Sequence, residues 1–121
     1  MRVIVVEPLE KPTAKDISSD LESMQKIVGG SIQAIYPFDE PVALICNEEG
    51  KLLNLPLNRA LRDDAGEVYD IISGTFFLCA APPDSEHFES LTDQQVETYM
   101  EHFAVPEMFL NFGGGLLAGW S

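Results

Sequence analysis

Residues 2–8 read RVIVVEP, and this run of β-branched side chains decides how the rest of the sequence is interpreted. Its apolar residues do not alternate with polar ones, which is typical of a strand buried on both faces. Pro8 ends the run, because proline cannot donate a ladder hydrogen bond. The pattern therefore predicts a central strand near the start of the chain, with the other elements arranged around it.

A first helix is predicted in residues 19–30, SDLESMQKIVGG. Ser19 and Glu22 have the spacing of a capping box, and the apolar residues that follow lie on one helical face. The Gly29–Gly30 pair supplies the stop, because glycine adopts the left-handed conformation at little cost.

A second helix is predicted after residue 91. Thr92 has the chemistry of an N-cap, and Gln95 stands at the capping-box position. Leu91 and Val96 have the spacing of a hydrophobic staple, and Pro106 ends the helix. This is the strongest local helix signal in the chain.

The other apolar runs predict strands, and the polar runs between them predict loops. Residues 42–53 are expected to form a hairpin, with strands at 42–46 and 51–53 around the turn NEEG. Further strands are predicted at residues 31–38 and, with a glycine-marked bulge, at 68–81. Irregular loops are predicted at 9–18 and 54–64.

These elements predict one domain of the α+β class. A chain of 121 residues fits a single domain, and no linker divides it. We expect a mixed or mostly antiparallel sheet of about four to five strands, with two helices packed on one face. The domain is predicted to span residues 1–110, followed by an apolar, glycine-rich tail at 111–121.

Acidic residues dominate the charge. Twenty Asp and Glu stand against seven Lys and Arg, which gives a formal net charge of -13. Such a surface repels phosphate groups, so direct binding to nucleic acid or to an anionic membrane is not expected. A basic partner protein suits it better. The alternative is that the acidity only keeps the protein soluble.

The chemistry-bearing side chains predict neither an enzyme nor a metal protein. Cys46 and Cys79 lie in apolar runs, His87 in a loop and His102 near the end of the second helix, so two packed thiols and two surface histidines are expected, with a Cys–His pair formed on folding as the alternative. No zinc-binding spacing and no phosphate-binding glycine loop occurs. We expect no catalytic residue, metal or cofactor. With no apolar run of membrane-spanning length, a cytoplasmic protein with reduced thiols is expected.

The segment NLPLNRALRDD, residues 54–64, is the candidate ligand site. Its amides and guanidinium groups can form hydrogen bonds with a carboxylate, a phosphate or a purine edge, and a nearby tyrosine could line a pocket. The alternative is that the arginines pair with neighbouring acids and the asparagines close turns. The candidate residues are Tyr36, Asn54, Asn58, Arg59 and Arg62.

The apolar tail predicts self-association. Large exposed apolar patches usually mark contact surfaces. The side chains concerned are those of Phe109, Phe112, Leu116, Leu117 and Trp120. A homo-oligomer formed through this tail is therefore expected.

Read in order, four segments resemble the bacterial family catalogued as domain of unknown function 3846. The segments are EPLEKP, LESMQKIVGGSIQAIYPF, VALICNEEGKLLNLPLNRALRD and YDIISGTFFLC, within about residues 2–110. The most specific motifs are LQxxVGG, NEEGK and LPxNRxL, and Met24 stands where a leucine is commoner. The resemblance implies a setting in phages and mobile elements of Gram-positive bacteria, near anti-restriction genes. It implies no activity.

Two functions follow from the sequence. The first is a non-enzymatic acidic binding protein, an accessory or anti-defence factor that acts by protein contact, with DNA mimicry as its most specific form. The second is a domain that binds or sequesters a nucleotide-like molecule through Asn58 and Arg59.

Overall fold

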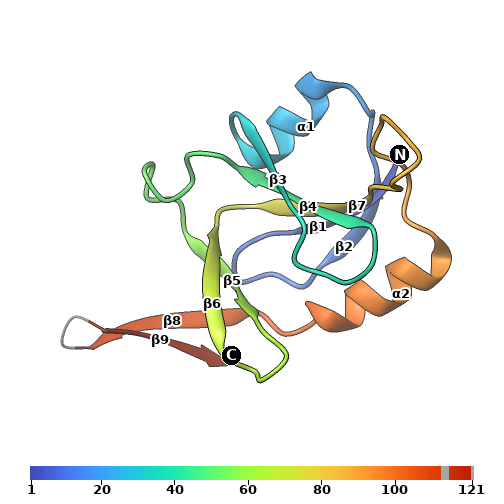
Figure 1. Cartoon of the computed structure of the whole chain (residues 1–121). Coiled ribbons are helices and arrows are strands. Elements are labelled where there is room, and N and C mark those ends of the chain that lie inside the picture. The colour runs from blue at the N-terminus through green and yellow to red at the C-terminus, as the bar shows by residue number, and fades with distance from the viewer. Residues whose placement is uncertain (113–114, 121) are drawn as a thin grey trace.

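The computed structural model describes residues 1–112 and 115–120, with side chains as far as residue 109. Figure 1 shows a sheet across the middle of the molecule and two smaller hairpins at one end. The elements are β1 (Arg2–Val6), β2 (Thr13–Asp16), α1 (Leu21–Val28), β3 (Ile32–Ile35), β4 (Val42–Asn47), β5 (Leu57–Arg62), β6 (Val68–Ser73), β7 (Phe76–Ala80), α2 (Asp93–His102), β8 (Glu107–Phe112) and β9 (Gly115–Trp120).

The central sheet is antiparallel, with five strands in the order β2-β1-β7-β4-β3. β1, β7 and β4 occupy the inner positions and are almost wholly buried, which is what their unbroken apolar sequences predict. β5–β6 and β8–β9 form separate two-stranded sheets. The predicted α+β class, the single domain and the central position of the first strand are confirmed.

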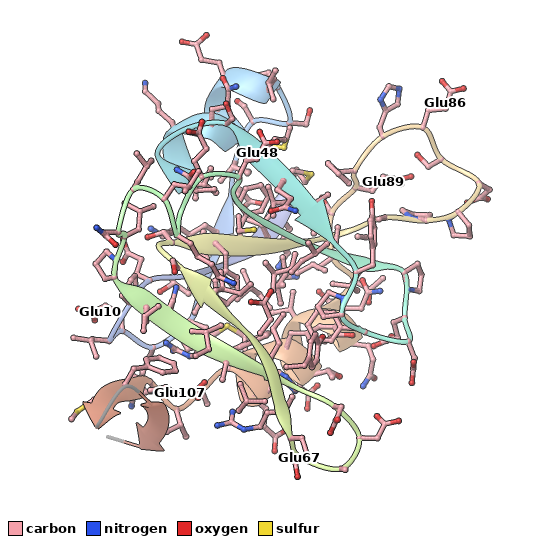
Figure 2. All side chains as sticks on the ribbon, turned by 60° about the vertical axis from the view of Figure 1, so that its left-hand side comes forward. Glu10, Glu48, Glu67, Glu86, Glu89 and Glu107 are labelled. Carbon is pink, nitrogen blue, oxygen red and sulfur yellow. The ribbon has the colours of Figure 1, made fainter. Side chains whose placement is uncertain are left out.

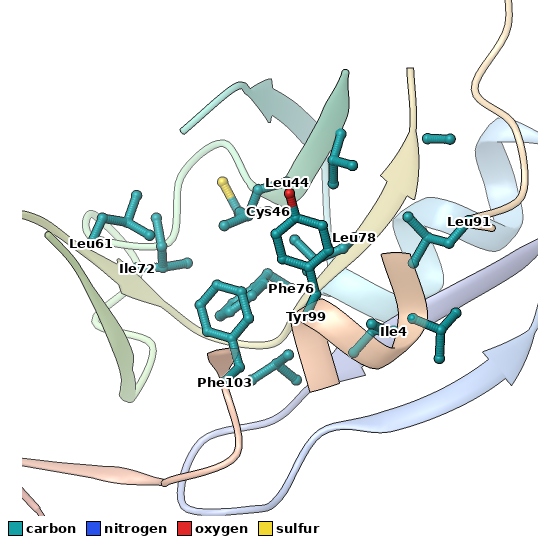
Figure 3. Packing of buried hydrophobic residues seen from close by; sticks show 14 residues of the cluster. Ile4, Leu44, Cys46, Leu61, Ile72, Phe76, Leu78, Leu91, Tyr99 and Phe103 are labelled. Carbon is teal, nitrogen blue, oxygen red and sulfur yellow. The ribbon is translucent and has the colours of Figure 1, made fainter. Parts of the chain in front are cut away.

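The helices lie on opposite faces of the central sheet, so the prediction that both cover one face is wrong (Figure 1). Val3 and Phe77 point toward α1, whereas the adjacent Ile4 and Phe76 point toward α2. The physical reason is that strands apolar on both faces need cover on both. Figure 3 shows Tyr99 of α2 and the C-cap residue Phe103 packed over this second face.

The helix-capping predictions hold in part. Asp20, not Ser19, is the N-cap of α1, and its carboxylate accepts hydrogen bonds from the backbone and the hydroxyl of Ser23. These hydrogen bonds lower the pKa of Asp20. Gly29 ends the helix with φ +80°, as predicted. The capping box of Thr92 with Gln95 is confirmed in both directions.

The hairpin predicted at residues 42–53 is wrong. β4 pairs with β3 on one side and with β7 on the other, so both of its edges are occupied. Residues 48–54 form consecutive turns instead. A tight hairpin follows later, between β5 and β6, where Asp63 Oδ1 accepts hydrogen bonds from the backbone N–H groups of Ala65 and Glu67.

Three further predictions are corrected. Residues 54–64 are not an irregular loop, because most of them form β5. Residues 68–81 are two strands, β6 and β7, separated at Gly74 with φ +83°. The predicted loop at residues 9–18 contains the edge strand β2. All of its residues are exposed, so its sequence lacks the alternating apolar pattern that would predict a strand.

The tail predictions fall mainly outside the described side chains. β8 spans the predicted boundary at residue 110, so the division into residues 1–110 and 111–121 stays a prediction. Of the apolar residues proposed for self-association, Phe109 has a described side chain, and the side chains of the others lie outside the described residues.

We predict that Thr92→Ala lowers the free energy of unfolding by about 1 kcal/mol, because the N-cap hydroxyl accepts from Gln95. Urea denaturation measures the change. Thr98→Ala, on an exposed position within α2, is the control and should change it by less than about 0.5 kcal/mol. Equal effects of the two substitutions would contradict the capping role.

Candidate functional site

Asn58 and Arg59 are fully buried, with exposed fractions of 0% and 1%. The Asn58 amide donates to Val6 O at 2.8 Å and to Gly74 O at 2.9 Å. Its Oδ1 accepts from Arg59 Nη1 at 2.9 Å. The side chain thus fastens β5 to the end of β1 and to the junction between β6 and β7.

The Arg59 guanidinium is held almost entirely by carbonyl oxygens. Nη1 donates to Asn58 O as well as to Asn58 Oδ1, and Nη2 donates to Glu10 O at 2.6 Å and Phe103 O at 3.1 Å. These four bonds use the four terminal hydrogens and leave Nε–H. Burial lowers the pKa of Arg59, and the charge of Glu107 opposes that shift.

This network forms a junction that we call the Asn58–Arg59 junction. It joins β5 to the β1–β2 loop through Glu10 and to the end of α2 through Phe103. A buried polar group is tolerated only when its hydrogen bonds are made, and here they are made with segments distant in sequence. The motif LPLNRAL is therefore explained by folding, with few donors left for a ligand.

A cleft opens beside the junction. Glu107, the first residue of β8, accepts from the Ala60 backbone N–H at 3.1 Å through Oε2. Its Oε1 lies 3.2 Å from Arg62 Nη1, and the carboxylate is almost fully buried. Figure 2 shows Glu107 at the start of β8. The cleft measures about 340 Å³ and is lined by Arg59, Ala60, Arg62, His102, Phe103, Val105 and Glu107.

His102 stands at the edge of this cleft. Its ring packs at 4.6 Å from Phe103 and at 5.7 Å from Phe38, measured between centroids. Loss of water around the ring lowers the pKa of His102, and the negative charge of Glu107 offsets part of the shift.

The structure brings together only some of the predicted site residues. Arg59 and Arg62 line the same cleft, while Asn58 is turned into the fold. Tyr36 is 60% exposed and lines a different pocket with Pro82. Asn54 is exposed, in the turn before β5.

Glu107 and His102 are the cleft residues that sequence reasoning missed. The signal for Glu107 was a lone carboxylate at the start of the apolar run MFLNF. The signal for His102 was its position in the last turn of a helix.

Both thiols are buried. Burial raises the pKa of Cys79 to about 12. Burial also raises the pKa of Cys46, with the charge of Asp70 adding and that of Lys51 opposing. Within the described part of the chain, no three His, Cys, Asp or Glu side chains gather as a metal site would require.

The family model described as a domain of unknown function (DUF3846) matches residues 1–104. The chain belongs to this family. The match spans the central sheet, both helices and the Asn58–Arg59 junction, and it ends shortly before Glu107. No curated protein and no solved structure matches the chain. In the described residues, no helix is both long and apolar enough to cross a membrane.

We predict that Arg59→Met lowers the free energy of unfolding by at least about 3 kcal/mol, because several buried acceptors lose donors at about 1–3 kcal/mol each. Chemical denaturation measures the loss. Arg2→Met breaks an exposed ion pair with Asp93 and should change the same quantity by less than about 1 kcal/mol. Similar losses would mean that the junction contributes no more than a surface contact.

We also predict that neither thiol is reactive in the folded protein. Cys46 and Cys79 should react with a chromogenic disulfide at least about 100-fold more slowly in buffer than in denaturant, because burial disfavours both access and the thiolate. The single-cysteine variants Cys46→Ala and Cys79→Ala assign the two rates. Rapid modification of either thiol in buffer would show that it is accessible.

Proposed function

We propose that the protein is a non-enzymatic, cytoplasmic binding protein that captures a basic partner protein through an acidic face. The face is formed by the β3–β4 loop, α2 and the β5–β6 turn. Its carboxylates are those of Asp39, Glu40, Asp63, Asp64, Glu67, Asp93, Glu97 and Glu101, all exposed.

The observation that supports this proposal is that most of the Arg and Lys side chains are paired or buried within the fold. Arg2, Lys51 and Arg62 form ion pairs, and Arg59 is buried in the junction. The remaining cations, within the described residues, are Lys11, Lys15 and Lys26.

Two of these lysines lie on the far side of the sheet. Lys26 belongs to α1, and Lys15 is paired with Val3, whose side chain points toward α1. Paired residues in neighbouring strands share a face, so Lys15 points away from α2. Neither of these lysines therefore compensates the acidic face, whose Asp93 is paired with Arg2.

The carboxylates of α2 form a stripe. Asp93, Glu97 and Glu101 are four residues apart and so lie on one side of the helix. At 1.5 Å per residue the stripe carries one charge per about 6 Å, against one per about 3.4 Å along a DNA strand. The stripe alone is thus a sparse imitation of DNA, and mimicry requires the flanking turns.

The flanking turns are held beside α2 by packing. Phe38 packs on Tyr99 with ring centroids 4.6 Å apart, and the Tyr99 hydroxyl donates to Glu40 at 2.7 Å. At the other end of the helix, Arg62 and His102 share the cleft. Figure 1 shows both turns near α2, and Figure 2 shows Glu67 at the tip of the β5–β6 hairpin.

In its most specific form, the proposed function is DNA mimicry by an anti-defence factor of a phage or mobile element. The negative face would occupy the basic cleft of a nuclease or restriction enzyme. The resemblance to the family's mobile-element members motivates the setting, and the placement of the charges motivates the mode of contact.

The nucleotide-binding hypothesis stays a prediction, and the geometry favours it less. The Asn58 amide and the terminal hydrogens of Arg59 are already engaged within the fold. Self-association through the tail also stays a prediction.

We predict that the purified chain inhibits DNA-binding nucleases in a salt-sensitive manner, tested with a type I restriction enzyme, a type II restriction enzyme and a non-specific nuclease. Affinity for the captured enzyme should fall at least about tenfold between 50 and 300 mM salt. Duplex DNA should compete for the same enzyme. Absence of binding to all three enzymes, or binding unaffected by salt, would contradict the proposal.

Two triple variants with the same change in net charge test which carboxylates bind the partner. Neutralising Glu67, Glu97 and Glu101 to glutamine should weaken binding at least about tenfold at 50 mM salt. The control neutralises Glu22, Glu48 and Glu49, which lie in α1 and after β4, with the same change in net charge. Equal weakening by both variants would show that net charge, and not the acidic face, determines binding.

A further inference from the structure

The central sheet ends at β2 on one side and at β3 on the other, so each of these strands has one edge without a neighbouring strand (Figure 1). The carbonyl of Ser31 accepts from the Glu48 N–H on the β4 side at 2.8 Å. Backbone groups of successive residues point to alternate sides of an antiparallel strand. Those of Ile32 and Ala34 therefore point away from β4, where a further strand can pair with them.

The two edges differ in charge. β2 carries Lys15 and Asp16, and charged side chains are one means by which proteins protect an edge from pairing. β3 has the sequence IQAI, without a charged residue, in a chain of which 22% of the residues are charged. Its apolar side chains are only half-buried. The edge of β3 is therefore suited to receive an added strand, and that of β2 is not.

Pockets lie beside β3 on both faces of the sheet. The first, of about 260 Å³, is lined by Ile35 and Cys46, whose side chains belong to the face of α2. The second, of about 570 Å³, is lined by Met24, Tyr36 and Phe88, on the face of α1. An added strand sends successive side chains to opposite faces. Its alternate side chains would thus meet one pocket or the other.

The first pocket favours a basic side chain. Glu48 and Asp70 each contribute a carboxylate, and Lys51 Nζ pairs with Asp70 at 2.6 Å. Among the described residues, Glu48 forms no ion pair, so the pocket keeps one negative charge without a partner. Ile71 and Ile72 provide apolar walls, along which the stem of a lysine or arginine can lie while its charged end meets the carboxylate.

The second pocket favours an apolar side chain. Most of the residues that line it are apolar or aromatic, namely Met24, Tyr36, Ala81, Pro82, Pro83 and Phe88. Its volume is within the range of sites that enclose a small molecule, so a large aliphatic or aromatic side chain fits. The two pockets therefore differ in the side chain that each would accept.

We propose that the free edge of β3 binds an extended segment of a partner protein as an added strand. A lysine or arginine of the segment enters the pocket beside Glu48, and an apolar side chain an odd number of positions away enters the pocket beside Tyr36. Acidic side chains lie near both ends of β3, at Glu48 and Asp39, so a second copy of the chain would bring like charges together. β3 is not part of the acidic face, so this proposal does not depend on the proposed function.

Hydrogen exchange of the full chain, measured by nuclear magnetic resonance, tests the proposal with two eight-residue peptides of one composition. In the first, lysine alternates with valine or phenylalanine, and in the second the lysines and the apolar residues form two blocks. The alternating peptide should slow exchange of the Ile32 and Ala34 N–H groups at least tenfold. The Ala14 and Asp16 N–H groups, which point outward from β2, should change less than twofold. The block peptide should bind at least tenfold more weakly.

Three results of this experiment would overturn the proposal. The first is no protection of β3 by the alternating peptide, and the second is equal protection of β2 or equal binding of the block peptide. The third is protection of Ile32 and Ala34 without peptide that rises with protein concentration, which would mean that a second copy occupies the edge.

Methylation of the peptide backbone distinguishes strand addition from attraction between charges. The alternating peptide is made in two further versions, one N-methylated at its lysines and the other at its apolar residues, so that each has one edge blocked. An added strand pairs with β3 through one edge only, so one version should lose at least tenfold in affinity and the other less than threefold. Equal loss in both versions, or loss in neither, would overturn the proposal.

Two lysine substitutions locate the binding edge. Gln33 is exposed on β3 and lines the pocket beside Glu48, so Gln33→Lys should weaken binding of the alternating peptide at least fivefold by charge repulsion. Ala14→Lys makes the same change in net charge on exposed β2 and should change the affinity less than twofold. Equal effects would show that net charge determines binding, and would overturn the proposal.

The triple glutamine variant of the acidic face separates this proposal from the proposed function. Its substitutions at Glu67, Glu97 and Glu101 lie outside β3, so it should bind the alternating peptide within threefold of the unsubstituted chain at 150 mM salt. A larger loss would place the peptide on the acidic face and would overturn the assignment to β3.

Discussion

The burial of one guanidinium, that of Arg59, is the constraint on which the arrangement of the smaller elements depends. Its terminal hydrogens bind carbonyl oxygens from β5, the β1–β2 loop and the end of α2. A planar group with several donors in fixed directions can hold three segments at once, which a lysine ammonium cannot do as well. The β5–β6 hairpin, which is too small to be stable alone, is thereby fixed to the central sheet.

The burial of Arg59 also affects the balance of charge on the surface. Because Arg59 is inside and Arg2, Lys51 and Arg62 are paired, few cations remain to balance the exposed carboxylates. The formal charge of -13 is therefore carried mainly by exposed carboxylates. An acidic composition alone says little about binding. The proposed acidic face is compensated at one position at least, where Arg2 pairs with Asp93.

What the sequence predicts well is encoded locally. The unbroken run of β1 and the capping box of Thr92 need no distant partner, so both were predicted. β5 was missed because Asn58 and Arg59 interrupt its apolar pattern, and their burial depends on Glu10 and Phe103, more than 40 residues away. The cleft was missed for the same reason, since a sequence pattern does not show which carboxylate will meet a buried arginine.

The junction and the cleft share Arg59 and Phe103, and the cleft adds Glu107 from β8. The motif LPLNRAL lies within the residues matched by the family, whereas the acceptor Glu107 lies beyond residue 104, at the start of β8. The residues up to 104 can hold the guanidinium in place, since its carbonyl partners all precede that point. The cleft therefore combines five lining residues from the matched region with Val105 and Glu107, which follow it.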